Sequence, residues 1–275
     1  MDLRLGFFSG AVRDWAPNRV ATATAGAGFT AIEWEMRDGE GHIRAQAAVD
    51  DALARRRESD GVGLEICCVS VNPVLSLLHE ASVDAVIQAA STCGAPLARM
   101  FAPPFDPARG IDDQLQAVQS ALARHARGFA HHGVTLVIEL SEETIVPSPE
   151  LLRRVCAGID PEAVGALYDP ANMLVEGNVS PPLALALLGD YLHHVHIKNE
   201  LFVRSDDGTW GPVIVRADEG LVDWPGVFAE LRRAGYGGHV VIDHLSDDAS
   251  VERMQLEREV AESLWAAMPL RYGIP

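Results

Sequence analysis

Short runs rich in apolar and β-branched residues recur along the chain and alternate with stretches of helical spacing. The runs predict eight strands, at residues 3–8, 30–34, 62–70, 97–102, 134–140, 164–169, 192–198 and 238–243. Helical spacing or helix-forming composition predicts helices between them, for example at 43–58, 82–92, 111–130 and 224–234, and a closing helix at 247–267. Strands that alternate with helices predict βαβ units and a parallel sheet.

Eight such units favour an α/β fold of the closed (β/α)₈ TIM-barrel type over an open doubly wound sheet. An open nucleotide-binding sheet would carry a glycine-rich turn after its first strand, and "GAGF" at 26–29 instead leads from a helix into a strand. No linker divides the chain, so we expect a single TIM-barrel domain over residues 1–275. The longest irregular stretch is expected at 199–223, between the last two strands.

Polar side chains stand near the ends of the last four predicted strands. These are Glu139 in "VTLVIEL", Asp169 in "VGALYD", His196 in "LHHVHIK" and Asp243 in "GHVVID". In a TIM barrel the C-terminal ends of the strands form one mouth, where active sites gather. We therefore expect these four side chains to converge.

The stretch "HHVHIKN" at 193–199 adds a second polar pattern. Strand alternation puts His194, His196 and Lys198 on one face and His193 on the other. Lys198 is the only lysine among 22 Lys and Arg residues. His131 and His132 precede the fifth strand, at the wrong end of the barrel, so we assign structural roles to them and to His193.

Three converging carboxylates repel one another unless they are protonated or neutralised by a cation. Taken singly, each acid could be a helix cap or a loop acceptor, His196 a satisfied core histidine, and Lys198 a charge reaching solvent. Together the four groups form an O,O,O,N set that suits Mn²⁺, Mg²⁺, Co²⁺ or Zn²⁺. His196 would bind the ion through one ring nitrogen and donate from the other to a supporting acceptor. Lys198 would then meet a substrate oxygen.

Composition narrows the class of partner. The net charge of −17 and the absence of a basic run longer than "ARRR" at 54–57 argue against nucleic acid. The four cysteines show no CxxC spacing, which favours buried thiols in a reducing compartment. No signal peptide and no apolar run of membrane-spanning length stand out. We expect a cytoplasmic protein with no membrane partner.

Four stretches resemble the xylose-isomerase-like TIM-barrel superfamily, which includes sugar epimerases, hydroxypyruvate isomerases and inosose dehydratases. They are "VIEL", "YDPANM", "HHVHIKN" and "DEGLVDWPGVFAELRRAGYGGHVVID", and the likeness is most specific over 134–243. The resemblance implies a divalent metal, most often Mn²⁺, held by Glu139, Asp169, His196 and Asp243. It also implies acid/base roles for Glu139 and Asp243, and a homodimer.

Two positions depart from the family pattern. Asn172 stands where a histidine is frequent, and Asp243 stands where a glutamate is usual. Aspartate is shorter by one methylene, a loss of reach of about 1.5 Å that a metal site tolerates better than a proton transfer does.

The resulting hypothesis is a metal-dependent isomerase or epimerase that acts on a small keto-sugar or polyol through an enediolate. Glu139 would be the base, and Asp243 a ligand and its partner on the opposite face. The expected substrate-binding residues are Lys198, His194, Asn172, Trp34 and Glu33. Glu35 shares the strand face of Glu33, and only one of the two is expected to approach the site. Trp210 is a further aromatic candidate, while Phe7 is expected in the core.

Three other readings stay open. A metal-dependent lyase of the inosose dehydratase type would use the same enolate chemistry with one base. An endonuclease acting at abasic DNA sites would need more metal ligands and a basic face, and the charge disfavours it. A non-catalytic binding module would show neither metal nor turnover.

Overall fold

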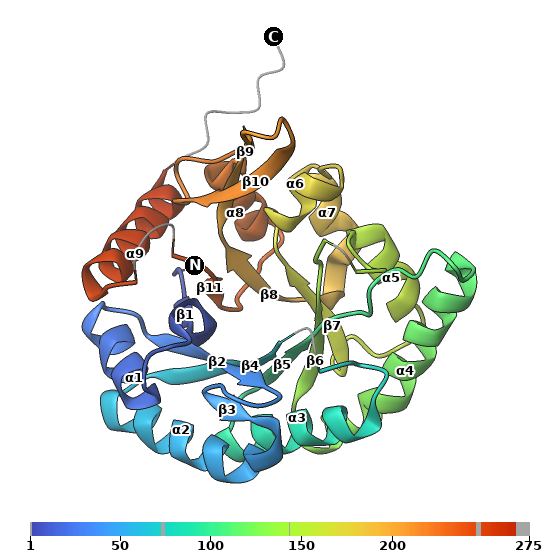
Figure 1. Ribbon diagram of the computed structural model, residues 1–275, viewed down its shortest axis with the longest axis horizontal. Helices are drawn as coiled ribbons and strands as arrows, with labels where there is room; N and C mark the ends of the chain where they lie inside the picture. Colours follow the sequence, from blue (N-terminus) through green and yellow to red (C-terminus); the bar gives the residue numbers. More distant parts are fainter. Residues whose placement is uncertain (1, 73–74, 143, 246–248, 268–275) are drawn as a thin grey trace.

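The computed structural model describes residues 2–72, 75–142, 144–245 and 249–267, and its centre is a closed parallel β-barrel (Figure 1). The barrel strands are β1 (Leu5–Phe8), β2 (Ala31–Arg37), β4 (Glu65–Val71), β5 (Leu97–Met100), β6 (Thr135–Glu139), β7 (Val164–Tyr168), β8 (Leu192–Ile197) and β11 (Val240–Ile242). Each strand pairs in parallel with its neighbours, and β1 closes the ring by pairing with both β2 and β11. The predicted (β/α)₈ TIM barrel is confirmed.

Helices surround the barrel in a ring (Figure 1). They are α1 (Pro17–Gly26), α2 (Ala48–Val62), α3 (Glu80–Cys93), α4 (Ile111–His131), α5 (Pro149–Cys156), α6 (Asn172–Glu176), α7 (Pro181–Leu188), α8 (Trp224–Arg233) and α9 (Val251–Ala266). Helix α4 shows why they pack there: Leu115, Val118, Leu122 and Phe129 recur at helical spacing and are all buried. Among the described residues, no helix is both long enough and apolar enough to cross a membrane.

The predicted helix at 43–58 and the closing helix at 247–267 both begin later than expected. Ile43–Arg44 forms a short strand, β3, beside β2, and residues 45–47 form a 3₁₀ turn before α2 begins at Ala48. Helix α9 begins at Val251, where the Ser250 side chain accepts a hydrogen bond from the backbone N–H of Arg253. Such a cap marks a helix start. Residues 247 and 248 lie outside the described part.

The prediction of an irregular stretch at 199–223 is wrong. Strands β9 (Asn199–Arg204) and β10 (Trp210–Val215) form an antiparallel hairpin after β8. The turn between them uses Gly208 at a positive φ of 88°, a conformation that favours glycine. The β-branched and aromatic residues of "LFV" and "PVIV" supply the strand-forming side chains.

Alternation along β2 sends its side chains to two different layers. Trp34 is fully buried, and its indole N–H donates to Ser59 Oγ of α2 at 3.1 Å. Trp34 therefore packs between strands and helices, a position that does not favour its predicted contact with substrate. Phe7 also lies in the core, as expected, with its ring 5.5 Å from that of Phe29. Glu33 and Glu35 point the other way, into the barrel.

Candidate functional site

Three predicted ligands meet inside the barrel. Ligand atoms of Glu139 at the end of β6, Asp169 just after β7 and His196 on β8 all lie within 4.8 Å of one another, and all three residues are buried. Asp243 follows β11 and joins them, with its Oδ1 3.4 Å from His196 Nδ1. Nδ1 is also 3.9 Å from Glu139 Oε1. The last four barrel strands therefore bring these groups to one place.

Unpartnered buried atoms test whether the cluster fits a cation. Asp169 Oδ1 accepts from the backbone N–H of Ala171 at 2.9 Å, but Oδ2 is buried and has no hydrogen-bond partner in the described part of the chain. His196 Nδ1 is likewise buried without one. Buried acceptors left without a donor are costly, and a cation would satisfy both atoms. The donor set of three carboxylates and one imidazole fits a divalent ion.

The electrostatics of the cluster lead to the same conclusion. Burial raises the pKa of Asp169 to about 7, although Lys198 opposes the shift. Burial alone would lower the pKa of His196, but the carboxylates of Glu33 and Asp243 outweigh it and raise that pKa to about 9. The cluster thus gathers protons when no other positive charge is close. A divalent ion would replace those protons.

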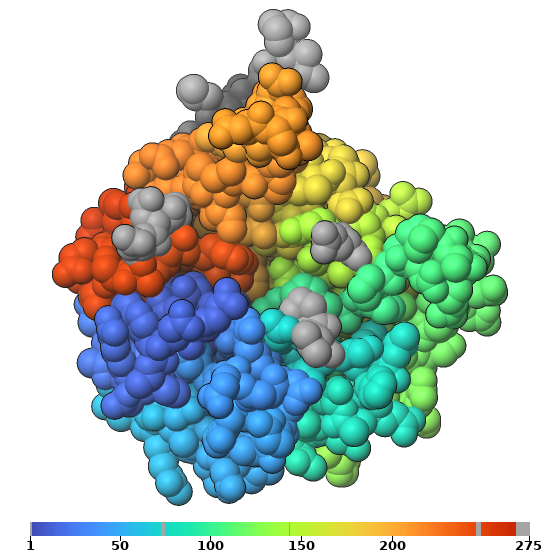
Figure 2. All heavy atoms as spheres, in the orientation of Figure 1, coloured from blue at the N-terminus to red at the C-terminus, as the bar shows by residue number. Residues whose placement is uncertain are grey.

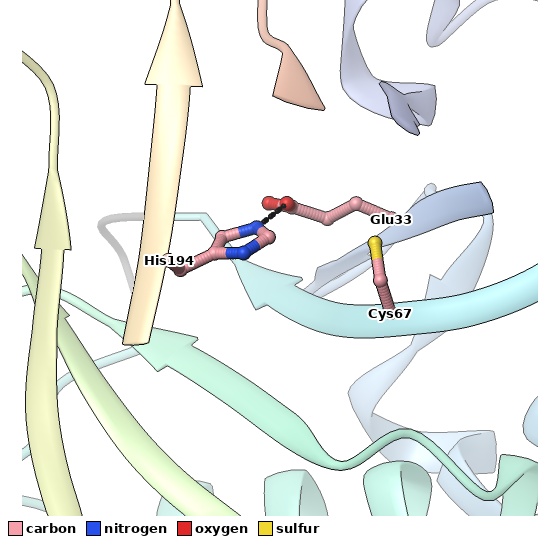
Figure 3. Close-up of side chains that lie close together, drawn as sticks. All are labelled: Glu33, Cys67 and His194. Carbon is pink, nitrogen blue, oxygen red and sulfur yellow. Dashed lines mark hydrogen bonds and ion pairs between the residues drawn. The ribbon is translucent and has the colours of Figure 1, made fainter. Parts of the chain in front are cut away.

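Glu33 contacts two histidines, His194 (Figure 3) and His196. Its Oε2 lies 2.6 Å from His194 Nε2, and both of its oxygens lie 3.1 Å from His196 Nε2. Ser70 donates to the same carboxylate. With Nε2–H donating to Glu33, Nδ1 of His196 faces the other carboxylates, and a bound divalent ion would take the place of the proton on that nitrogen.

Cys67 also lies close to Glu33 and His194, so these three residues could be read as a second ligand group (Figure 3). Burial raises the pKa of the Cys67 thiol well above its usual value. The thiol donates to the carbonyl of Ile32 at 3.3 Å. Because only the thiolate binds metals well, we assign this group to packing and support of His196.

A cavity of about 270 Å³ opens above the cluster. Four of the predicted site residues line it: Glu139, Asn172, Lys198 and Asp243. Figure 2 shows the face of the molecule hollowed near its centre, among segments coloured blue, green and orange. Glu33 and His194 are fully buried below and do not line the cavity, so their predicted contact with substrate is not met. Glu35, two residues further along β2, lines it instead.

Lys198 is held by a short polar chain. Its Nζ donates to Asn172 Oδ1, and Asn172 Nδ2 donates to Glu139 Oε1 at 3.1 Å. Asp169 and Glu200 each place an oxygen 3.5 Å from the ammonium. Burial would lower the pKa of Lys198, but Asp169 and Asp243 outweigh it and raise it, so the ammonium stays charged. Lys198 is 8% exposed, which rules out a charge merely reaching solvent.

The sequence reading missed Arg99, which forms a buried ion pair with Glu139. Its guanidinium stacks near Phe8 and Phe101, 5.2 Å and 4.6 Å from the ring centres. The acidic neighbours, Glu139 first, raise its pKa against the effect of burial. The sequence did contain a signal for Arg99: like Lys198, it is a basic residue within an apolar strand, here "LARMFA".

His244 was also missed. Its Nδ1 lies 2.7 Å from Asp243 Oδ2, and that carboxylate raises the pKa of the imidazole. The His244 side chain is 43% exposed, so it connects Asp243 with solvent. No motif in the sequence separates this histidine from an ordinary loop residue.

The residues assigned to structural roles lie away from the cavity. His193 Nε2 contacts the carbonyl of Pro161 at 2.7 Å on the outside of β8. His131 and His132 stand at the end of α4, with their rings in edge contact. Trp210 is 67% exposed on the hairpin and does not line the cavity.

Three comparisons relate the chain to known proteins. An inosose dehydratase of Geobacillus kaustophilus is 26% identical over 152 residues, which cover 51% of this chain and 49% of that relative. The chain thus spans about half the length of the curated relatives it matches. A D-tagatose 3-epimerase-like protein has a TM-score of 0.76 at 15% identity, covering 95% of this chain and 97% of its own. The 3-keto-D-glucoside 4-epimerase of E. coli has a TM-score of 0.75 at 15% identity, covering 95% and 100%.

The structural likenesses concern the fold alone, since the identities are low. The family match is broader than the match to any curated relative. The statistical model of the family described as "Xylose isomerase-like TIM barrel" matches residues 21–265, from α1 to the end of α9. This chain, with its closed parallel barrel and its cluster of acids and imidazole at the ends of the last four strands, belongs to the xylose isomerase-like TIM barrel family.

Proposed function

We propose that this chain is a divalent-metal-dependent isomerase or epimerase that acts on a small keto-sugar or polyol through an enediolate. One observation carries the proposal: Glu139, Asp169, His196 and Asp243 converge, and Asp169 Oδ2 and His196 Nδ1 are buried without a hydrogen-bond partner in the described structure. A sugar epimerase and an epimerase-like protein with the same fold support the reaction class.

The four converging residues would hold the metal, for which Mn²⁺ is the first candidate. A bound divalent ion polarises a carbonyl and its neighbouring hydroxyl, which makes the adjacent C–H more acidic. Glu33 would fix the ring of His196 by accepting its Nε2 proton, and it would not touch substrate. Asp169, anchored through Oδ1 to the backbone, would present Oδ2.

Proton transfer would fall to the two carboxylates that line the cavity. Glu139 contacts Arg99 and Asn172, which hold its carboxylate at the cavity wall, where it would act as the base. Asp243 comes from a different strand, and His244 beside it gives a proton a route to solvent. Lys198 would donate to substrate oxygens as negative charge develops on them.

A metal-dependent lyase remains the second candidate. The curated relative that is 26% identical over 152 residues is an inosose dehydratase, and a dehydratase is a lyase. Loss of water beside a carbonyl begins with the same proton abstraction. His244, which also lines the cavity, would protonate the departing hydroxyl, while the Lys198 ammonium would stabilise the enolate oxygen.

Metal analysis followed by exchange in D₂O tests both candidates. We expect about one divalent ion per chain, and C–H exchange with members of a panel of ketoses and inososes, without water loss for an isomerase and with it for a lyase. Glu139→Gln should slow exchange by about 10²–10⁴-fold. His132→Gln, at the exposed end of α4, is the matched control. Full turnover of Glu139→Gln, or of a metal-stripped sample, would refute the proposal.

Finer points of the hypothesis are proposals too. We propose a cytoplasmic location, from the four free and buried thiols. We propose a small-molecule substrate rather than nucleic acid, from the net charge of −17. A homodimer is proposed from the family resemblance, and sedimentation equilibrium of the purified protein tests it directly.

A further inference from the structure

A second cavity of about 600 Å³ lies beside the reaction pocket. Its walls come from the connection after β1 and the connection after β2, and include Arg13, Trp15, Glu35, Arg37, Glu40 and His42. Three of these residues, Arg13, Glu35 and Arg37, also line the reaction pocket. The two cavities therefore adjoin, and a ligand bound in one can extend into the other. We call the second cavity the side groove.

Glu35 stands at the junction with an unsatisfied oxygen. Its Oε1 accepts from Arg37 Nε at 2.7 Å, and its backbone N–H donates to Ser9 Oγ at 2.7 Å. Its Oε2 is buried and has no hydrogen-bond partner in the described structure, and the residue is 3% exposed. A buried carboxylate oxygen without a donor is costly, and a hydroxyl from a ligand would satisfy it. The junction is thus built to accept a hydrogen bond.

Hydrogen bonds and a stacking contact hold the part of the side-groove wall that His42 and Trp15 form. Ser9 Oγ lies 2.9 Å from His42 Nδ1, and His42 Nε2 lies 3.2 Å from the carbonyl of Trp15. Burial lowers the pKa of His42, so the neutral ring can donate from Nε2 to that carbonyl and accept at Nδ1. The guanidinium of Arg19 stacks 3.7 Å from the centre of the Trp15 ring. A rigid groove costs a ligand less to bind than a mobile one.

Size and charge indicate what the side groove accepts. At about 270 Å³ the reaction pocket lies near the lower end of ligand sites, which span roughly 300–1,000 Å³, and the groove adds far more space than one small sugar needs. Arg13 and Arg37 offer donors, while Asp14, Glu35 and Glu40 offer acceptors. Hydroxyl groups use both, whereas an anionic group is disfavoured because the three acids outnumber the two arginines.

We propose that the side groove is a second sugar subsite, so that the substrate is a glycoside: a keto-sugar in the reaction pocket bonded to a further polyhydroxyl unit beside Trp15. The assignment of the reacting half rests on the proposed function, but the groove itself does not. Glu35 accepts a hydroxyl where the two halves meet.

Binding measured by calorimetry tests the proposal without turnover. The metal-loaded protein is titrated with maltose, cellobiose and sucrose, and with D-glucose and D-fructose as their single-ring parts. We expect at least one disaccharide to bind about tenfold more tightly than its parts, which is about 1.4 kcal/mol. Trp15→Ala should reduce that ratio towards one. Trp210→Ala, on the exposed hairpin, is the matched control and should keep the ratio.

Glu35→Gln provides a second variant in case Trp15→Ala does not fold. Because Oε1 must still accept from Arg37, the new NH₂ group takes the place of Oε2 and turns a donor towards the ligand. The disaccharide ratio should again fall. The proposal is overturned if no disaccharide binds more tightly than its parts, or if Trp15→Ala weakens both ligands equally. Failure of C–H exchange would count against the proposed reaction and leave this result standing.

Discussion

Replacing Arg99 by methionine tests whether a bound metal ion neutralises the charge of Glu139, as Arg99 does in the metal-free protein. Arg99 and Glu139 form an ion pair in which each side chain is 5% exposed. Two unit charges at contact interact by about 4 kcal/mol at an effective dielectric constant of 20. Removal of one partner of a buried pair costs about 3–5 kcal/mol because the other charge stays buried. Arg99→Met should therefore lower the free energy of unfolding of the metal-free protein by that amount, and Tm by roughly 6–20 °C.

The same change should cost less when metal is present. If Glu139 is a ligand, the bound ion replaces Arg99 as the counter-charge of Glu139. The substitution also removes the Arg99 guanidinium, which would repel the ion. Linkage requires that the difference between the metal-free and metal-bound losses equals the gain in metal binding free energy. We expect a difference of at least about 1.4 kcal/mol, which corresponds to about tenfold tighter metal binding.

Urea unfolding in EDTA and in saturating Mn²⁺, together with calorimetric metal titration, measures every side of this cycle. Arg154→Met is the matched control, because its pair with Asp112 has side chains 55% and 78% exposed. It should cost no more than about 1 kcal/mol with or without metal. Equal losses for Arg99→Met in both conditions, or weaker metal binding, would show that the ion does not bind at Glu139.

Three further outcomes follow from buried groups elsewhere. Trp34→Phe removes the hydrogen bond to Ser59 and should lower stability by about 1–3 kcal/mol in urea unfolding, with KM unchanged, since Trp34 does not reach the cavity. Burial lowers the pKa of His239 to about 4, so the unfolded chain binds more protons below its ordinary pKa. The free energy of unfolding should therefore fall by about 3 kcal/mol as the pH drops from about 6.5 to 4. The fall should be smaller in His239→Asn, and an equal pH slope in the unchanged protein and this variant would contradict the reasoning. Burial raises the thiol pKa of Cys93 to about 11 and of Cys156 to about 12, and all four cysteines are buried. The native protein should not react with Ellman's reagent at pH 8, whereas the unfolded chain should release four equivalents.

The barrel was predictable because its strands are short apolar runs bounded by polar turns, and all eight predicted runs contain an observed strand or overlap one. The ends and the pairing register of the barrel strands were less predictable. Register shifts occur between Ile32 and Glu33 on β2 and between Ala166 and Leu167 on β7. A bulge adds a residue to one strand without altering its composition, so the sequence pattern does not reveal it.

The four ligand candidates were predictable because chain direction and alternation suffice to place them. All parallel strands end at the same mouth, and each candidate lies within two residues of the end of its strand. Depth within the barrel follows a different rule. Glu33 and Glu35 share a face, yet only Glu35 lines the cavity, because it lies two residues, about 6.6 Å, closer to the C-terminal end of β2. Alternation gives the face of a residue, but the depth at which the cavity ends depends on the side chains from the other strands.

The two buried cations beside the cluster differ in kind, and their surroundings explain why. Arg99 lies near two aromatic rings, Phe8 and Phe101, where a flat, weakly hydrated guanidinium packs well. Lys198 instead meets oxygens from Asn172, Asp169 and Glu200, and these surround a compact ammonium that has no flat face to stack. The other 21 Lys or Arg positions in the chain are arginines, and the single lysine stands where a planar guanidinium group would fit worst. This is why the oddity in "HHVHIKN" pointed to the site, whereas Arg99, one arginine among 21, did not.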